Sequence, residues 1–143
     1  MSKTFILGPC AAESREQVLE IADSLSNLSA AGGLIFRSGI WKPRTSPTTF
    51  QGVGEAGLPW LQEVQERYHL PIAPEVATPD HVQAIANSLS GEAGLSAQRS
   101  FRDSGLYLWL GARTCANPIA VQAIADTLSA QRSFSDSGLS AKR

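Results

Sequence analysis

Cysteine is scarce in this chain of 143 residues, and long apolar runs are absent. The two cysteines, Cys10 and Cys115, are too few for the disulfide framework of a small secreted protein. No apolar run approaches the length of a transmembrane helix, and the first residues lack the apolar stretch of a signal peptide. These absences predict a cytoplasmic protein that does not contact a membrane.

An excess of charge of either sign is also missing. The chain has 12 basic and 13 acidic residues, which give a net charge of −1. This balance argues against general binding to nucleic acid. A hydrophobic content of 43% and a charged content of 17% are typical of a globular protein, and the length is enough for one core.

Acidic residues are absent from residues 24–54, and three cations lie within this range. Arg37, Lys42 and Arg44 therefore have no carboxylate near them in the sequence. Pro43 fixes φ between Lys42 and Arg44, so the segment is semi-rigid. Arginine forks onto oxyanions and lysine supplies a point charge, which favours a site for a phosphorylated or carboxylated small molecule. The alternative is a solvated basic loop without a ligand.

Apolar periodicity predicts an α/β fold. Short apolar runs predict strands at residues 5–7, 34–38, 71–76 and 106–110, and helical spacing predicts helices at 14–28, 58–68, 79–89 and 118–128. Strand and helix alternate four times, which implies a parallel sheet with helical crossovers. Ser14 begins a capping box, and Thr78-Pro79 and Asn117-Pro118 each pair an N-cap with a first-turn proline. We expect the first strand to be buried. Pro74 would remove a hydrogen-bond donor from a central strand.

Two internal repeats interrupt this pattern. Residues 82–86 recur as residues 121–125, within the third and fourth predicted helices. The seven residues from Leu95 recur from Leu128, and both copies continue to Asp-Ser-Gly-Leu. Both copies of this second repeat are rich in Ser, Gly and Arg, so we expect a flexible loop at the first copy and a flexible tail at the second.

One motif carries a resemblance to a known family. The segment from Arg37 to Pro47 reads Arg-Ser-Gly-Ile-Trp-Lys-Pro-Arg-Thr-Ser-Pro, and Phe-Gln-Gly follows at 50–52. This pattern resembles 3-deoxy-7-phosphoheptulonate synthase, or DAHP synthase. The Lys-Pro-Arg-Thr core is specific, because the sister enzyme 3-deoxy-manno-octulosonate 8-phosphate synthase typically has Lys-Ala-Asn-Arg there. The resemblance covers roughly residues 5–89 and 107–127.

The resemblance implies a (β/α)₈ barrel of the TIM type. A full barrel needs about 250 residues, so this chain would hold about four of the eight units, a half-barrel. We expect a partial barrel domain at 1–128, with an inserted Ser- and Arg-rich loop at 90–105 and a flexible, repeat-containing tail at 129–143. A homo-oligomer could complete the ring of strands.

The resemblance also implies a reaction. The family condenses phosphoenolpyruvate with erythrose 4-phosphate to 3-deoxy-7-phosphoheptulonate and phosphate, in the first step of the shikimate pathway to the aromatic amino acids. Arg37, Lys42 and Arg113 would bind phosphoenolpyruvate. Arg44 and Thr45 would bind the aldose phosphate. Lys42 and Glu75 would be catalytic; without the resemblance, Glu75 is a solvated carboxylate and Arg113 part of a surface salt bridge.

A divalent metal ion is the cofactor that the resemblance implies. Family members use the cysteine of a Gly-Pro-Cys segment as a ligand of Mn, Fe, Co or Zn, and Cys10 holds that place here with Glu75 close by. The alternative is that Cys10 is a small buried residue. The other family ligands and a second lysine have no matching motif in this chain. Two hypotheses remain: a synthase whose isolated chain is inactive, or a non-catalytic half-barrel that keeps an anion-binding loop.

Other aromatic and histidine residues are weaker candidates. Trp41 and Trp109 are interpreted as packing residues. His81 falls in the first turn of a predicted helix, and we expect it to be exposed.

Overall fold

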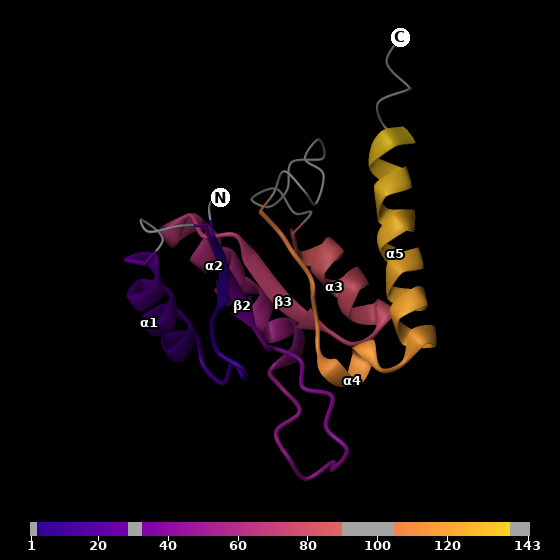
Figure 1. Ribbon diagram of the computed structural model, residues 1–143, viewed down its shortest axis with the longest axis horizontal. Coiled ribbons are helices and arrows are strands. Elements are labelled where there is room, and N and C mark those ends of the chain that lie inside the picture. Colours follow the sequence, from indigo (N-terminus) through magenta and orange to yellow (C-terminus); the bar gives the residue numbers. More distant parts are fainter. Residues whose placement is uncertain (1–2, 29–32, 90–104, 138–143) are drawn as a thin grey trace.

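The computed structural model describes residues 3–28, 33–89 and 105–137 (Figure 1). Four parallel strands form one sheet in chain order: β1 (Thr4–Leu7), β2 (Gly33–Ser38), β3 (Ile72–Val76) and β4 (Trp109–Leu110). The longer helices are α1 (Arg15–Ser26), α2 (Leu58–Tyr68), α3 (Pro79–Leu89) and α5 (Pro118–Ser137). The 3₁₀ helix η2 (Gly54–Gly57) precedes α2, and the short α4 (Ala112–Cys115) precedes α5. This arrangement of parallel βα units confirms the predicted half-barrel.

Helices α1, α3 and α5 begin with the side-chain caps that the sequence predicted. The Ser14 hydroxyl accepts a hydrogen bond from the Gln17 amide at 3.1 Å, and the Gln17 side chain accepts one from the Glu13 amide at 2.9 Å. Thr78 and Asn117 likewise accept amide N–H groups at the starts of α3 and α5. The two cap-plus-proline devices therefore position the helices that follow β3 and β4.

One face of the sheet carries the hydrophobic core. Leu34 and Phe36 of β2, with Ile72 and Val76 of β3, belong to a cluster with the apolar faces of α1, α2 and α3. In Figure 1, α1 and α2 flank β1 and β2, whereas α3 and α5 lie side by side near the β4 end. Strand residues alternate between faces, so Glu75 projects to the opposite face from Val76.

The first strand is exposed, which corrects the expectation of a buried strand. Phe5 and Ile6 are each 45% exposed, and Leu7 is 39% exposed. β1 pairs with β2 along one edge, and within the described residues its other edge has no partner strand. Its apolar side chains therefore lack the neighbours that a closed barrel would place on both sides.

The fourth strand is shorter than predicted. Only Trp109 and Leu110 pair with β3 as a ladder, and Leu106 is joined to Ile72 by an isolated bridge in the same register. The backbone N–H and C=O groups of Ile72 both form hydrogen bonds to residues of the segment 105–107. Every second residue of a strand points its backbone groups to the same side, so the N–H that Pro74 lacks would also have pointed toward the β4 side. The lost donor expected of Pro74 thus falls in the gap of the β3–β4 ladder.

The end of the chain also differs from expectation. Helix α5 continues through Ser137, although we expected a flexible tail from residue 129. Residues 128–137 contain neither proline nor glycine, so nothing in them ends a helix. The expected insert at 90–105 lies outside the described residues except for Gly105. Every helix in the described ranges is too short or too polar to cross a membrane.

Candidate functional site

A buried ion pair joins the ends of β2 and β3. Lys42 begins the loop of residues 42–51, called here the cationic loop, and Glu75 is the fourth residue of β3. The Lys42 Nζ lies 2.7 Å from the Glu75 Oε2. The two side chains are only 8% and 15% exposed. Burial of the ammonium is tolerated because the carboxylate pairs with it.

Cys10 lies beside this pair, at the carboxyl end of β1. Its Sγ is 3.6 Å from the Lys42 Nζ, and its side chain is exposed, so the alternative of a small buried residue is wrong. Three successive strand ends therefore contribute one side chain each to a cluster around a single ammonium. Carboxyl ends of parallel strands meet at one rim, as the sequence led us to expect.

Arg113 connects the fourth strand end to the same place. It lies in α4, directly after β4, and its Nη1 donates a hydrogen bond to the Pro43 carbonyl oxygen at 2.8 Å. The guanidinium is exposed and, like that of Arg44, forms no ion pair within the described ranges. Arg113 therefore does not form the surface salt bridge of the alternative interpretation within these ranges.

A hollow of about 220 Å³ brings five of the seven predicted site residues together. Its lining consists of Cys10, Lys42, Pro43, Arg44, Glu75, Gly111, Ala112, Arg113 and Thr114. Three cationic side chains face one carboxylate, so the hollow favours an anion.

Two of the predicted residues are not part of this lining. The Arg37 guanidinium lies over the ring of Trp109, 5.3 Å from its centroid. Trp109 therefore supports a cation, beyond the packing role we expected. Thr45 is exposed farther along the cationic loop.

Two glycines make room for the ion pair, and sequence reasoning missed both. A Cβ added to Gly111 would lie 2.5 Å from the Glu75 Oε1, and one added to Gly39 would lie 2.5 Å from the Lys42 Nζ. Each contact is too short for a real side chain. The Gly-Ala-Arg-Thr segment at 111–114 includes Gly111, but the reason for a glycine there is its contact with Glu75, which the sequence does not reveal.

His81 is half-buried, which corrects the expectation of an exposed side chain. Its ring stacks on Trp41, with centroids 4.3 Å apart and planes 9° apart. The Nδ1 accepts a hydrogen bond from the Ala77 amide at 3.1 Å. Burial lowers the pKa of His81, against the opposing effect of Asp80 and Glu55.

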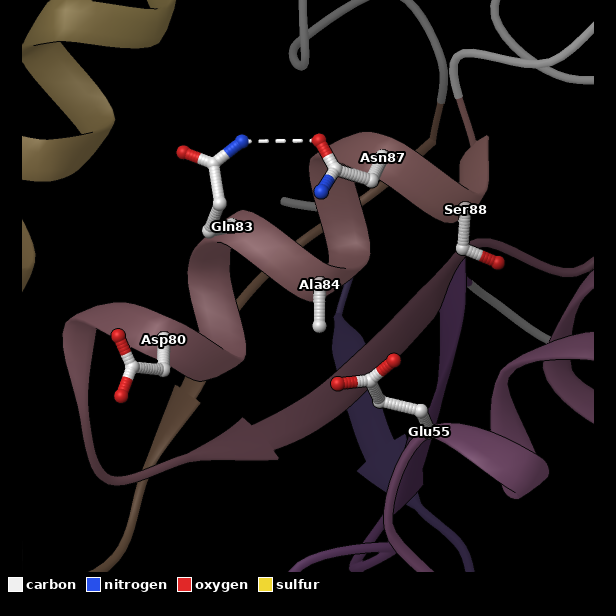
Figure 2. Close-up of a pocket in the computed structure, with 6 residues that line it drawn as sticks. All are labelled: Glu55, Asp80, Gln83, Ala84, Asn87 and Ser88. Carbon is white, nitrogen blue, oxygen red and sulfur yellow. Dashed lines mark hydrogen bonds between the residues drawn. The ribbon is translucent and has the colours of Figure 1, made fainter.

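A second hollow, of about 430 Å³, lies between η2 and α3. Figure 2 shows Glu55 from the first of these elements and Asp80 from the second, with Gln83 hydrogen-bonded to Asn87 at 2.9 Å. Ala84 and Ser88 complete the lining. The two carboxylates have no cationic side chain beside them in this lining, so this hollow does not suit the anion favoured by the first one.

The residues present do not fit a divalent metal ion. The described ranges contain no group of three or more His, Cys, Asp or Glu side chains that could hold one. Cys10 and Glu75 are two donors that both contact the Lys42 ammonium. A divalent metal ion needs more ligands than these two, and the ligands must be oriented by further hydrogen bonds. The Lys42 ammonium lies between Cys10 and Glu75, and its positive charge opposes the binding of a metal cation there.

Comparison with known proteins identifies the family. A sequence profile of the DAHP synthetase I family matches residues 2–93. The chain belongs to this family. A phospho-2-dehydro-3-deoxyheptonate aldolase of Thermotoga maritima is 42% identical over 83 residues, which are 58% of this chain and 24% of that relative. A 2-dehydro-3-deoxyphosphooctonate aldolase of Methylobacillus flagellatus is 37% identical over 103 residues, or 67% of this chain and 37% of that relative.

A solved structure supports the half-barrel. The crystal structure of a DAHP synthase from Thermotoga maritima matches this member of the DAHP synthetase I family with a TM-score of 0.52 and 37% identity. The match covers 60% of this chain and 24% of that chain. The chain thus spans between about a quarter and somewhat over a third of the relatives it matches.

Proposed function

We propose that the hollow around Lys42 binds phosphoenolpyruvate, and that the chain forms the substrate-holding part of a DAHP synthase. The observation that carries this proposal is the convergence of Lys42, Arg44 and Arg113 on one hollow with a single carboxylate. Phosphoenolpyruvate carries a phosphate and a carboxylate, and it needs cations at two places. The hollow offers them from two different segments of the chain.

Free donors remain on two of the cations after their contacts within the protein. An ammonium has three N–H donors, and Lys42 directs one to Glu75 and one to Cys10. One donor is left for an oxygen of the ligand. Arg113 uses Nη1 on the Pro43 carbonyl, and its remaining N–H groups can fork onto a phosphate. The protein contacts thus position both cations without exhausting them.

The reaction explains why the cations are fixed in advance. C3 of phosphoenolpyruvate attacks the aldehyde of erythrose 4-phosphate, water adds at C2, and inorganic phosphate leaves. Lys42 and Arg113 would hold the phosphoenolpyruvate, with Arg37 beside them, and Arg44 and Thr45 would hold the aldose phosphate. Preorganised cations stabilise negative charge as it develops and require little reorganisation during the reaction. Glu75 keeps the Lys42 ammonium in place for this purpose.

Calorimetry with phosphoenolpyruvate and with erythrose 4-phosphate tests the binding steps. We expect Lys42→Ala to weaken binding of phosphoenolpyruvate and Arg44→Ala to weaken binding of erythrose 4-phosphate, each by roughly 1.5–3 kcal/mol, the scale of hydrogen bonds to charged groups. Arg44 is exposed, so its replacement should leave the fold intact. Arg67→Ala, which removes an exposed cation from α2, is the control and should bind as the unmodified chain does. Unchanged binding in both loop variants would show that the hollow is not the site.

A second candidate reaction forms the eight-carbon product named for the phosphooctonate relatives, which are 33–37% identical to this chain. Phosphoenolpyruvate contributes three carbons, so the partner would then be a five-carbon aldose phosphate. The Lys-Pro-Arg-Thr motif at 42–45 favours the four-carbon partner instead. Binding of both aldose phosphates in the presence of phosphoenolpyruvate distinguishes the two. We expect the four-carbon sugar to bind more tightly, and Arg44→Ala to reduce that preference.

A further inference from the structure

We propose that Trp41 and His81 form a clamp that fixes the base of the cationic loop to the first turn of α3. In this proposal His81 is a positioning residue for Lys42. The inference rests on the proposed function, because it assigns the clamp a role in holding the anion-binding loop. Its geometry, however, can be tested without any ligand.

The base of the loop is a small paired structure. Trp41 and Gly52 form an antiparallel bridge, and the Lys42 amide donates to the Gln51 carbonyl at 2.9 Å. The Gly54 amide donates to the Ile40 carbonyl, also at 2.9 Å. Lys42 is therefore the first residue beyond a closed base, so the orientation of that base sets the direction of its side chain.

The base is held at two points, one in β3 and one in the first turn of α3. Glu75 binds the Lys42 ammonium, and His81 stacks on Trp41. The His81 ring is itself fixed, because its Nδ1 accepts from the Ala77 amide and its backbone amide donates to Thr78 at 3.4 Å. Trp41 is thus tied to the start of α3 and the adjacent Lys42 to β3, which restricts both translation and rotation of the base.

The clamp depends on the neutral form of the imidazole. A neutral ring presents an unprotonated Nδ1 to the Ala77 N–H, whereas protonation would place a hydrogen there and remove the bond. Burial lowers the pKa of His81, and Asp80 on α3 and Glu55 on η2 are the charged groups that oppose this shift among the described residues. A lowered pKa makes the stabilisation complete above about pH 6.5, the ordinary value. The stabilisation is lost as the pH falls from there through the lowered pKa.

Hydrogen exchange of the loop base and calorimetry with phosphoenolpyruvate test the clamp together. We expect His81→Ala to accelerate exchange of the Lys42 and Gly54 amides and to weaken binding about three- to tenfold, the scale of an aromatic pair. His81→Phe keeps a stacking ring that cannot be protonated. It should bind within about twofold of the unmodified chain near pH 7.5, and it should lose the additional weakening that develops as the pH falls below about 6.5.

A matched control is the other histidine. His69→Asn removes an exposed imidazole at the end of α2, where φ is 53° and asparagine is tolerated. This variant should keep the acid weakening, which assigns it to His81. Unchanged exchange and binding in His81→Ala would refute the clamp, and so would equal acceleration in α1 and in the loop base. If the unmodified chain binds no phosphoenolpyruvate, the proposed function fails, and the exchange rates alone decide on the clamp.

Discussion

Lys42 combines properties that are difficult to reconcile in an isolated lysine. It is nearly buried and paired with a carboxylate, and Gly39 brings the backbone close to it. Removal of an ammonium from water costs several kcal/mol, which only a well-placed carboxylate offsets. Glu75 supplies this carboxylate from the neighbouring strand, and Gly111 allows it to approach. The ion pair thus couples the geometry of the hollow to the stability of the fold.

A double-mutant cycle tests this coupling. Glu75→Leu should destabilise the chain by roughly 3–5 kcal/mol, because it leaves the Lys42 ammonium buried without a partner. Lys42→Met combined with Glu75→Leu should recover most of that loss, since an apolar pair of similar volume replaces the charges. Urea unfolding measures both values. A double variant no more stable than Glu75→Leu alone would mean that the unpaired Lys42 ammonium is not what destabilises Glu75→Leu.

Helix α1 shows how a local signal in the sequence becomes a structural element. Its N-cap involves only the Ser14 side chain and the Gln17 amide, three residues apart, so the cap depends on the local sequence and not on the rest of the fold. Ser14→Ala should reduce the free energy of unfolding by about 1 kcal/mol, because one amide at the helix start loses its acceptor.

Ser24→Ala provides the control for that measurement. Ser24 lies in the same helix, and its hydroxyl bonds back to the Glu20 carbonyl. Alanine is a better helix former, so this variant should be as stable as the unmodified chain or slightly more stable. Equal losses in both serine variants would contradict a specific role for the cap.

The elements that the sequence predicted best are those defined by local signals. Helices α1, α3 and α5 begin as their caps and prolines indicated, and β2 and β3 occupy the predicted apolar runs. The exposure of β1 and the short pairing of β4 could not be predicted, because both depend on which strand lies alongside. Apolar runs indicate a strand but carry no information on whether its edge is covered.

The candidate site divides in the same way. Cys10, Lys42 and Arg113 follow strand ends, Glu75 lies near the end of β3, and all four could be placed at one rim from motif and topology alone. The stack on His81 could not be found, because Trp41 and His81 are forty residues apart in the sequence and only Trp41 belongs to the motif. Contacts across the fold determine such roles.

At the scale of the whole molecule, the sheet ends in two open edges among the described residues. β1 exposes Phe5, Ile6 and Leu7 on one edge, and β4 pairs with β3 alone on the other. Open edges offer unpaired N–H and C=O groups to other strands. In a closed barrel of eight parallel strands, these edges would be joined by further strands.

The 143-residue chain as a separate polypeptide should therefore associate and should lack synthase activity. Association is expected because β1 of one copy can extend the sheet at β4 of another, which covers apolar side chains that otherwise face water. Inactivity is expected because the described residues hold neither enough metal donors nor a second lysine in the hollow. Light scattering measures the first property, and phosphate release with phosphoenolpyruvate, erythrose 4-phosphate and Mn²⁺ measures the second.

Charged substitutions in β1, such as Ile6→Lys, should shift a dimer or aggregate toward the monomer, whereas Ile119→Lys at an exposed position of α5 should not. A monodisperse monomer that releases phosphate only when both substrates are present would overturn both expectations, since it would show that this sheet needs no partner for its edges and that the hollow needs no further residues for its chemistry.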